Sequence, residues 1–295
     1  MQKGIYENMK PSLQLLLVFA IVGVSMIVML ILTFFTGINQ SMLSITASDV
    51  SSIRYLQIIQ SFAIFIIPPL IIAYLFSKKS LKWLGFERPE YFFLFIIPII
   101  LLIGCQPVIS FLADVNNSIE FPQFLKSFEN KLRLQEEMTN NLILKILTIK
   151  QPAIILLNAF IIVILPAFGE EMMFRGTLQP LLHKIFKNSH AAVLLTAFAF
   201  SFIHFQFMTF IPRFVLGAIL GYLYLYGKNI WYPILGHLTN NMLSFITFYY
   251  QLYTRPDIII DVPGEKFATG IIIASFVAIG FSMLVFRKIC SLLNQ

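Results

Sequence analysis

Residues 153–175 read AIILLNAFIIVILPAFGEEMMFR, an apolar run that passes directly into two adjacent carboxylates and an arginine. Charged side chains are costly at membrane depth, so they are rare there and mark functional sites by default. A second apolar run, residues 191–200, follows soon after. We therefore expect Glu170, Glu171 and Arg175 to lie near a bilayer. A structural or chemical role must offset the free-energy cost of placing their charges there.

The composition of the whole chain is that of a membrane protein. Of its 295 residues, 58% are hydrophobic and only 12% are charged, and the mean hydropathy is +0.82. These values predict an all-α, polytopic membrane protein rather than a soluble one. The length allows about eight transmembrane helices of about 20 residues each. The apolar runs expected to form them cover residues 12–36, 56–76, 91–113, 152–169, 189–206, 210–227, 230–250 and 267–286.

The basic residues indicate topology. The net charge is +7, but Lys and Arg occur mostly at the ends of apolar runs, a pattern that argues against nucleic acid as a partner. With the N-terminus inside, eleven of them fall in short cytoplasmic segments and four outside, which are Arg54, Arg213, Arg255 and Lys266. We therefore predict that both termini are cytoplasmic. The first run lacks an Ala-x-Ala cleavage site and is predicted to be a retained span, and Cys105 and Cys290 suggest no disulfide framework.

The long connection between residues 114 and 150 has its own helical pattern. Apolar residues recur there every three to four positions, with charged residues between them; they are Phe121, Leu125, Phe128 and Leu132. This spacing predicts an amphipathic helix around residues 118–148 that lies along the membrane surface. Two roles stay open for it, a solvated linker and a lid that gates substrate.

We expect one integrated membrane domain in three parts. Residues 1–150 hold the N-terminal helices and the amphipathic connection, residues 151–250 the core helices, and residues 251–295 a loop and the last transmembrane helix. Gly217 and Gly221 form a Gly-x-x-x-Gly pair that lets a neighbouring helix approach closely. Kinks are predicted near Pro68, Pro69, Pro107 and Pro166.

Glu170 and Glu171 are expected to have different roles. If residues 167–187 are helical, Glu171 and Arg175 stand at positions i and i+4, where they can pair and offset part of each other's desolvation cost. Glu170 is turned about 100° away on the helix. Burial makes a carboxylate a stronger base, so Glu170 is the first candidate for catalysis.

Two histidines and an amide extend the candidate site. His204 lies at the end of an apolar run, and His237 and Asn241 share one face of a helix. Together with Glu170 they point to a common site on separate helices. His183 and His190 lie in a Lys-containing, interfacial segment and receive no catalytic role.

These residues resemble the motifs of a known family, the type II CAAX prenyl proteases and their bacterial relatives, the CPBP or Abi proteins linked to bacteriocin maturation and immunity. The first motif, Glu-Glu-x-x-x-Arg, matches residues 170–175. The second, Phe-x-x-x-His, matches Phe200 and His204, and the third, His-x-x-x-Asn, matches His237 and Asn241. The resemblance covers roughly residues 150–250, and Asn240 stands as an alternative to Asn241.

The resemblance implies peptide-bond hydrolysis within a bacterial cell membrane, on a peptide or membrane-protein substrate that need not be prenylated. It implies that Glu170 and His204 activate water, and that His237 and Asn241 stabilise the oxyanion. A Glu and two His are also a zinc ligand set, so Glu170, His204 and His237 are possible ligands of a divalent metal. Family members have been described both as metalloproteases and as metal-independent glutamate proteases; we favour a site that requires no metal.

Two alternatives to a protease stay open, a proton- or cation-coupled transporter and a non-catalytic immunity protein of the same fold. The expected helices also pose a geometric problem. A straight helix from Ala191 would place His204 about 20 Å deep, whereas Glu170 lies near the end of its run. Either the helix that holds Glu170 continues past it, or residues 205–212 dip into the membrane.

Overall fold

The computed structural model describes residues 4–35, 50–88, 91–254 and 267–293, and every regular element in these ranges is helical. The chain divides into two compact units. Unit 1 comprises Met1–Arg88 and Leu144–Ala192, and unit 2 comprises Pro89–Ile143 and Val193–Gln295. The predicted all-α class is confirmed. The three-part division by residue ranges stays a prediction.

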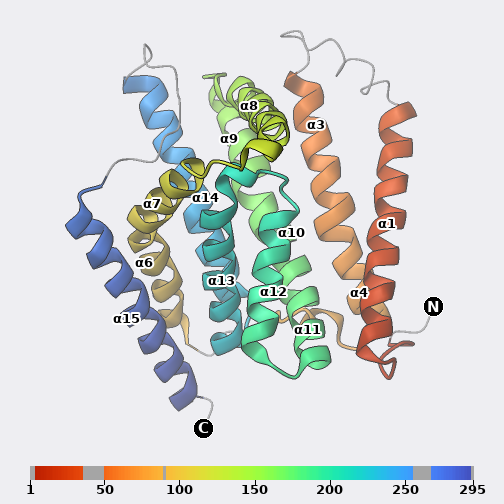
Figure 1. Cartoon of the computed structure of the whole chain (residues 1–295). Helices are drawn as coiled ribbons and strands as arrows, with labels where there is room; N and C mark the ends of the chain where they lie inside the picture. The colour runs from red at the N-terminus through yellow and green to blue at the C-terminus, as the bar shows by residue number, and fades with distance from the viewer. Residues whose placement is uncertain (1–3, 36–49, 89–90, 255–266, 294–295) are drawn as a thin grey trace. The chain divides into compact units, whose positions relative to one another are not determined.

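Unit 1 is built around two long helices that carry π-helical turns. In Figure 1, α1 (Pro11–Phe35) runs beside the helix formed by α3 (Val50–Gln60), η3 (Ser61–Ile66) and α4 (Ile67–Phe76), which it contacts. A short helix, α5 (Ser80–Trp83), follows. The second long helix consists of α9 (Pro152–Ala159), η6 (Phe160–Ile164), α10 (Leu165–Met173), η7 (Phe174–Leu178) and α11 (Gln179–Phe186).

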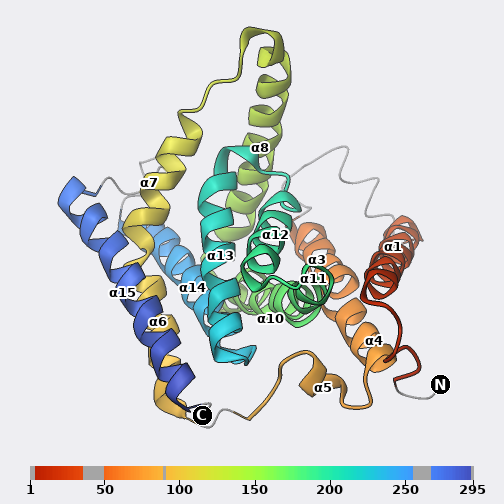
Figure 2. The same ribbon diagram turned by 60° about the horizontal axis from the view of Figure 1, so that its bottom comes forward.

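Unit 2 contains the remaining helices. It begins with η4 (Phe92–Phe95), α6 (Ile96–Gly104) and α7 (Gln106–Asn117), and continues with η5 (Gln123–Leu125) and most of α8 (Lys126–Leu147). After α12 (Ser189–Phe202) come η8 (Phe207–Thr209), α13 (Phe210–Gly227), α14 (Trp231–Thr254) and α15 (Thr269–Leu293). As Figure 2 shows, α13 lies against α7. The apolar core of unit 2 forms where α6, α13 and α15 meet, around Leu102, Leu220 and Phe286.

In the described parts of the chain, fewer helices qualify as candidate membrane spans than the eight expected. Among the described residues, five helices are long and apolar enough to cross a membrane, or six if the pair Phe92–Gly104 and Gln106–Asn117, bent by 40°, is one span. The α12 helix has 14 residues, about 21 Å of helix, which is short of a hydrocarbon core of about 30 Å. The α14 helix is long enough but carries His237, Asn240 and Asn241, which lower its hydropathy. Eight is therefore only an approximate count.

The helix that carries the acidic pair continues well past it. The apolar run was expected to end at residue 169, but the helix extends over Pro152–Phe186, 35 residues, so Glu170 lies near its middle. The helix that holds Glu170 thus continues past it, as one of the two expected alternatives required. The second alternative, that residues 205–212 dip into the membrane, stays a prediction. Residues 205 and 206 are not helical, and the turn η8 and the first residues of α13 follow them.

Two of the positions with a predicted kink have a π-helical turn, and the third has a bend between two helices. The segment η3 ends two residues before Pro68, and η6 ends two residues before Pro166. A proline ring clashes with the carbonyl four residues earlier, and a wider π turn relieves that clash. Pro107 instead follows the bend between α6 and α7.

The amphipathic connection forms a helix, but its protein-facing side is acidic. The helix α8 begins at Lys126, later than expected. The side chains of Phe128 and Leu134 are exposed, whereas those of Glu129 and Glu136 are buried, at 1% and 7% exposure. The hydrophobic pattern predicted the helix correctly and gave no sign that these two acids are buried.

Acidification should loosen the start of α8. The Glu129 carboxylate accepts hydrogen bonds from Arg133 Nε (2.8 Å) and the backbone N–H of Phe121 (3.0 Å). These bonds lower the pKa of Glu129 from about 4.5 to about 2. Because the folded-state pKa is lowered, the stabilisation is complete above pH 4.5 and is lost as the pH falls through about 2. Hydrogen exchange of residues 117–133 should therefore accelerate across this window, and the variant Glu129→Gln should not show that pH response.

Candidate active site

The acidic motif lies in unit 1, at the middle of its long helix. Arg175 Nη1 donates to Glu171 Oε1 at 2.6 Å, and both side chains are fully buried. This confirms the predicted i, i+4 pair. Glu170 is also buried, with 8% of its surface exposed. The π-helical segment η7 begins directly after α10, and such turns are frequent at functional sites.

Close packing fixes the backbone beside Glu170. The α10 helix contacts η3, and a Cβ atom on Gly169 would lie 2.9 Å from Phe65 Cβ and 3.1 Å from Ile66 Cγ1. Phe174 packs against the Phe65 ring, with the ring centroids 6.2 Å apart. Phe174 therefore has a packing role. Gly169, which the sequence reasoning did not single out, is needed for the approach of these two helices.

The second motif lies in unit 2, just after α12. His204 Nδ1 is 2.7 Å from the backbone oxygen of Phe200. A carbonyl oxygen can only accept, so Nδ1 carries the proton and Nε2 is the basic nitrogen. The backbone bond therefore selects the tautomer in which Nε2 can take a proton from water or bind a metal.

The phenylalanine of the second motif contacts both histidines. The Phe200 ring lies edge-on to His204, with centroids 5.2 Å apart, and to His237, at 5.8 Å. Phe200 and His237 are buried, with 1% and 4% exposure, and His204 is partly buried. The structure thus brings the two histidines together around one aromatic ring, which gives the Phe-x-x-x-His spacing a physical reason.

The two adjacent asparagines have different partners. Gln106 Nε2, at the start of α7, donates to Asn240 Oδ1, and Asn240 Nδ2 donates to Asn241 Oδ1, both at 3.3 Å. This chain of bonds uses the Asn241 oxygen and does not use its Nδ2 group. Asn241 can therefore present an N–H donor on the same helix face as His237. Gln106 was not predicted, because nothing in its local sequence marks it.

Two glycines of unit 2 have packing roles. A Cβ atom on Gly217 would lie 3.2 Å from Ala197 Cα, so the predicted close helix packing is confirmed there. A Cβ atom on Gly236 would lie 3.0 Å from a Leu220 methyl group and 3.1 Å from a Leu102 methyl group. Gly236 precedes His237 in the chain. Because it has no side chain, the apolar core of unit 2 can pack closely against it.

The charged and polar residues outside the motifs can be placed as well. His183 and His190 are exposed. Arg54, which the sequence counted as a topological charge, is buried and donates to the Asn158 side chain at 2.8 Å and to the Ile146 carbonyl at 3.0 Å. This arginine therefore has a structural role inside unit 1. Three of the basic residues used for topology lie outside the described residues; they are Lys3, Arg255 and Lys266.

The candidate residues fall into two groups, one in each unit. Glu170, Glu171 and Arg175 belong to unit 1, and the second group, His204, His237 and Asn241, belongs to unit 2. Within the described ranges, no three His, Cys, Asp or Glu side chains group closely enough to hold a metal ion. Neither unit therefore holds a complete metal site by itself among these residues.

The helices and the motifs together define the class of the protein. Several long apolar helices make it an integral, multi-pass membrane protein. Residues 152–243, less than half of the chain, match the family model described as Type II CAAX prenyl endopeptidase Rce1-like. This stretch, which contains all three motifs, is therefore similar to that family of endopeptidases. Comparison with curated proteins and with solved structures yields no match.

Proposed function

We propose that this protein is an intramembrane endopeptidase that hydrolyses a peptide bond in a peptide or membrane-protein substrate. The matched domain, residues 152–243, contains all three motifs, and this carries the assignment of class. The family supports a hydrolase acting within a lipid bilayer. We also propose roles for individual residues in this reaction.

In the proposed mechanism, Glu170 and His204 activate the attacking water. The carboxylate of Glu170 accepts a proton from water as the oxygen attacks the carbonyl carbon, and a buried carboxylate suits this role. His204 presents Nε2 because its Nδ1 is bonded to the Phe200 carbonyl. The proton then passes to the leaving amine, so the two products are a carboxylate and an amine.

His237 and Asn241 would stabilise the negative charge that develops on the carbonyl oxygen. Hydrogen-bond donors that are fixed before the reaction are most effective in a site of low dielectric constant. His237 is buried against Phe200. The Asn240–Asn241 bond uses an N–H group of Asn240 and the oxygen, not the N–H groups, of Asn241. This arrangement supports the role of Asn241 over that of Asn240.

The proposal is tested with purified protein in lipid vesicles and a peptide library. We expect cleavage, and we expect His204→Ala to lower kcat by about 100-fold or more, the scale of a lost acid–base group. His183→Ala is the matched control, because this exposed histidine has no assigned role. Cleavage that survives His204→Ala would refute the assigned site, and ion flux without cleavage would favour the transporter.

A chelator titration on the same preparation decides the role of a metal. Without a metal, cleavage is unchanged by chelation because Glu170 acts directly as the base. A loss on chelation that zinc restores would instead make Glu170, His204 and His237 the ligands that suit this ion. Either result leaves the identification of these three residues intact.

A further inference from the structure

His204 lies on a short, strained connection. Residues 203–206 join α12 to η8 without regular structure, and Phe205 has a φ of 52°. A bulky residue rarely adopts this left-handed conformation, which persists only where the surroundings fix it. The position of His204 therefore depends on the side chains that hold the connection in place.

One of those side chains comes from the amphipathic helix. Glu136 of α8 accepts hydrogen bonds from the backbone N–H of Met208 (3.0 Å) and from Thr209 Oγ1 (3.2 Å), four and five residues after His204. Met208 lies in the first turn of the helix Phe207–Gly227. The first N–H groups of a helix have no partners within it and carry the positive end of its dipole, so a carboxylate is a favourable acceptor there.

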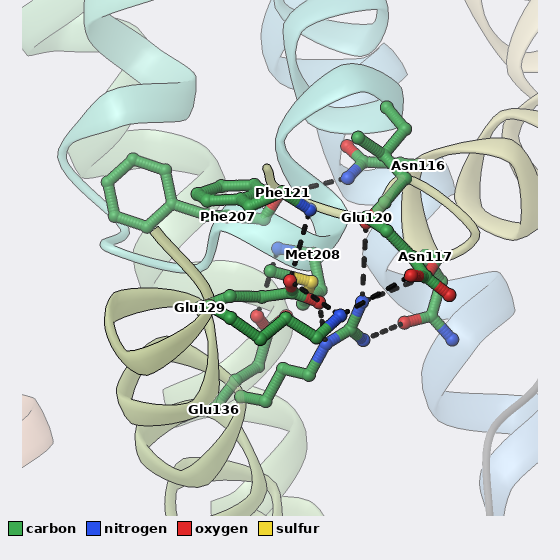
Figure 3. A network of polar contacts seen from close by, with 11 residues as sticks. Asn116, Asn117, Glu120, Phe121, Glu129, Glu136, Phe207 and Met208 are labelled. Carbon is green, nitrogen blue, oxygen red and sulfur yellow. Dashed lines mark hydrogen bonds and ion pairs between the residues drawn. The ribbon is translucent and has the colours of Figure 1, made fainter. Parts of the chain in front are cut away.

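A second side chain holds the same turn from α7. Asn116 Nδ2 donates to the Phe207 carbonyl at 2.9 Å, and Asn116 Oδ1 accepts from the Ile211 N–H at 2.7 Å. Figure 3 shows the side chains of Asn116 and Glu136 bonded to the backbone of Phe207 and Met208, respectively. The start of this helix is thus bonded to two helices that lie far from it in sequence.

The register of α8 is fixed by a second acidic residue. Glu129, seven residues before Glu136 and so on the same helix face, bonds to Arg133 and to the Phe121 N–H. Arg133 in turn donates to the Asn117 side chain at 3.0 Å. Because Asn117 adjoins Asn116, these bonds anchor α8 to the end of α7. These bonds therefore fix the position of α8, and with it the position of Glu136 beside Met208.

We propose that Glu136 is a positioning residue for His204. It acts through Met208 and Thr209, without contact to substrate, and fixes the turn that carries the imidazole. The inference rests on the proposed function of His204. It gives α8 a role beyond the linker or lid that its amphipathic pattern suggested, because the buried acidic face of the helix supports the site.

Kinetics of Glu136 variants in vesicles test the proposal. Glu136→Ala should lower kcat by about 10- to 100-fold, since small displacements of a catalytic group have effects of this size, and should leave KM nearly unchanged. Glu136→Gln, which can still accept from Met208 N–H, should restore most of the lost rate. Glu137→Ala is the matched control, because Glu137 is the exposed neighbour on the same helix.

Hydrogen exchange provides a measurement that does not depend on activity. Exchange in residues 203–211 should accelerate in Glu136→Ala and stay at the wild-type rate in Glu137→Ala. If Glu136→Ala does not fold, Thr209→Val removes one of the two bonds and keeps the side-chain shape. That variant should show a smaller acceleration together with a smaller loss of kcat.

These measurements distinguish a wrong active site from a wrong role for Glu136. Full cleavage by His204→Ala would refute the assigned site itself. If His204→Ala is inactive but Glu136→Ala retains wild-type kcat and exchange, positioning by Glu136 is wrong and the site stands. A loss of kcat in Glu136→Ala with unchanged exchange in residues 203–211 would also overturn positioning.

Discussion

Replacing Glu170 by glutamine should remove nearly all peptide cleavage, with kcat falling by about 100-fold or more. Glutamine has the shape of glutamate but cannot accept a proton from water at neutral pH, so the variant removes the base and keeps the side-chain shape. Glu170 is buried beside the close contact of Gly169 with Phe65, which holds the backbone in place. We therefore expect the loss to appear in kcat and not in the amount of folded protein.

The measurement is single-turnover cleavage of a peptide that the wild-type protein cleaves, in vesicles of one lipid composition. Gln179→Ala is a suitable control, because it alters another buried polar residue on the same long helix. Glu170→Asp should recover part of the rate, since it restores a carboxylate at a slightly different position. Wild-type cleavage by Glu170→Gln would exclude Glu170 as the base and direct attention to Glu171.

Much of the fold follows from the sequence because its signals are local. Apolar runs predicted five of the membrane-spanning helices, and the i, i+4 spacing predicted the Glu171–Arg175 pair. The same logic ended the apolar run at residue 169, because charges interrupt the hydropathy, and it left open whether the helix continues past Glu170. The helix continues to Phe186, since two of these charges neutralise each other inside the protein. Hydropathy alone cannot register that compensation.

The supporting residues of the site could not be found this way, because their partners are distant in sequence. Gln106 and Asn240 are separated by 134 positions, and Glu136 and Met208 by 72. On α8 an acid between apolar residues is the ordinary pattern of a solvated helix. Only the packing of α7 and α8 on the turn after His204 shows that Glu136 faces the protein. Such pairings are a property of the tertiary structure.

Breaking the Glu171–Arg175 pair should destabilise the protein strongly. Glu171→Met leaves the guanidinium of Arg175, which is fully buried, without the carboxylate that it bonds at 2.6 Å. Removing one partner of a buried pair costs about 3–5 kcal/mol. Arg175→Met should cost less, because the remaining carboxylate can take up a proton, whereas a guanidinium stays charged.

The double variant separates structure from chemistry. With methionine at both positions the pair leaves no charge buried, so stability should return to within about 1–2 kcal/mol of the wild type. Unfolding of all four proteins in detergent gives the coupling energy of the pair. If Glu171 is only structural, cleavage returns with stability in the double variant. If the double variant is stable but inactive, the pair contributes to the reaction as well as to stability, through Glu171 itself or through the electrostatic interaction of Arg175 with Glu170.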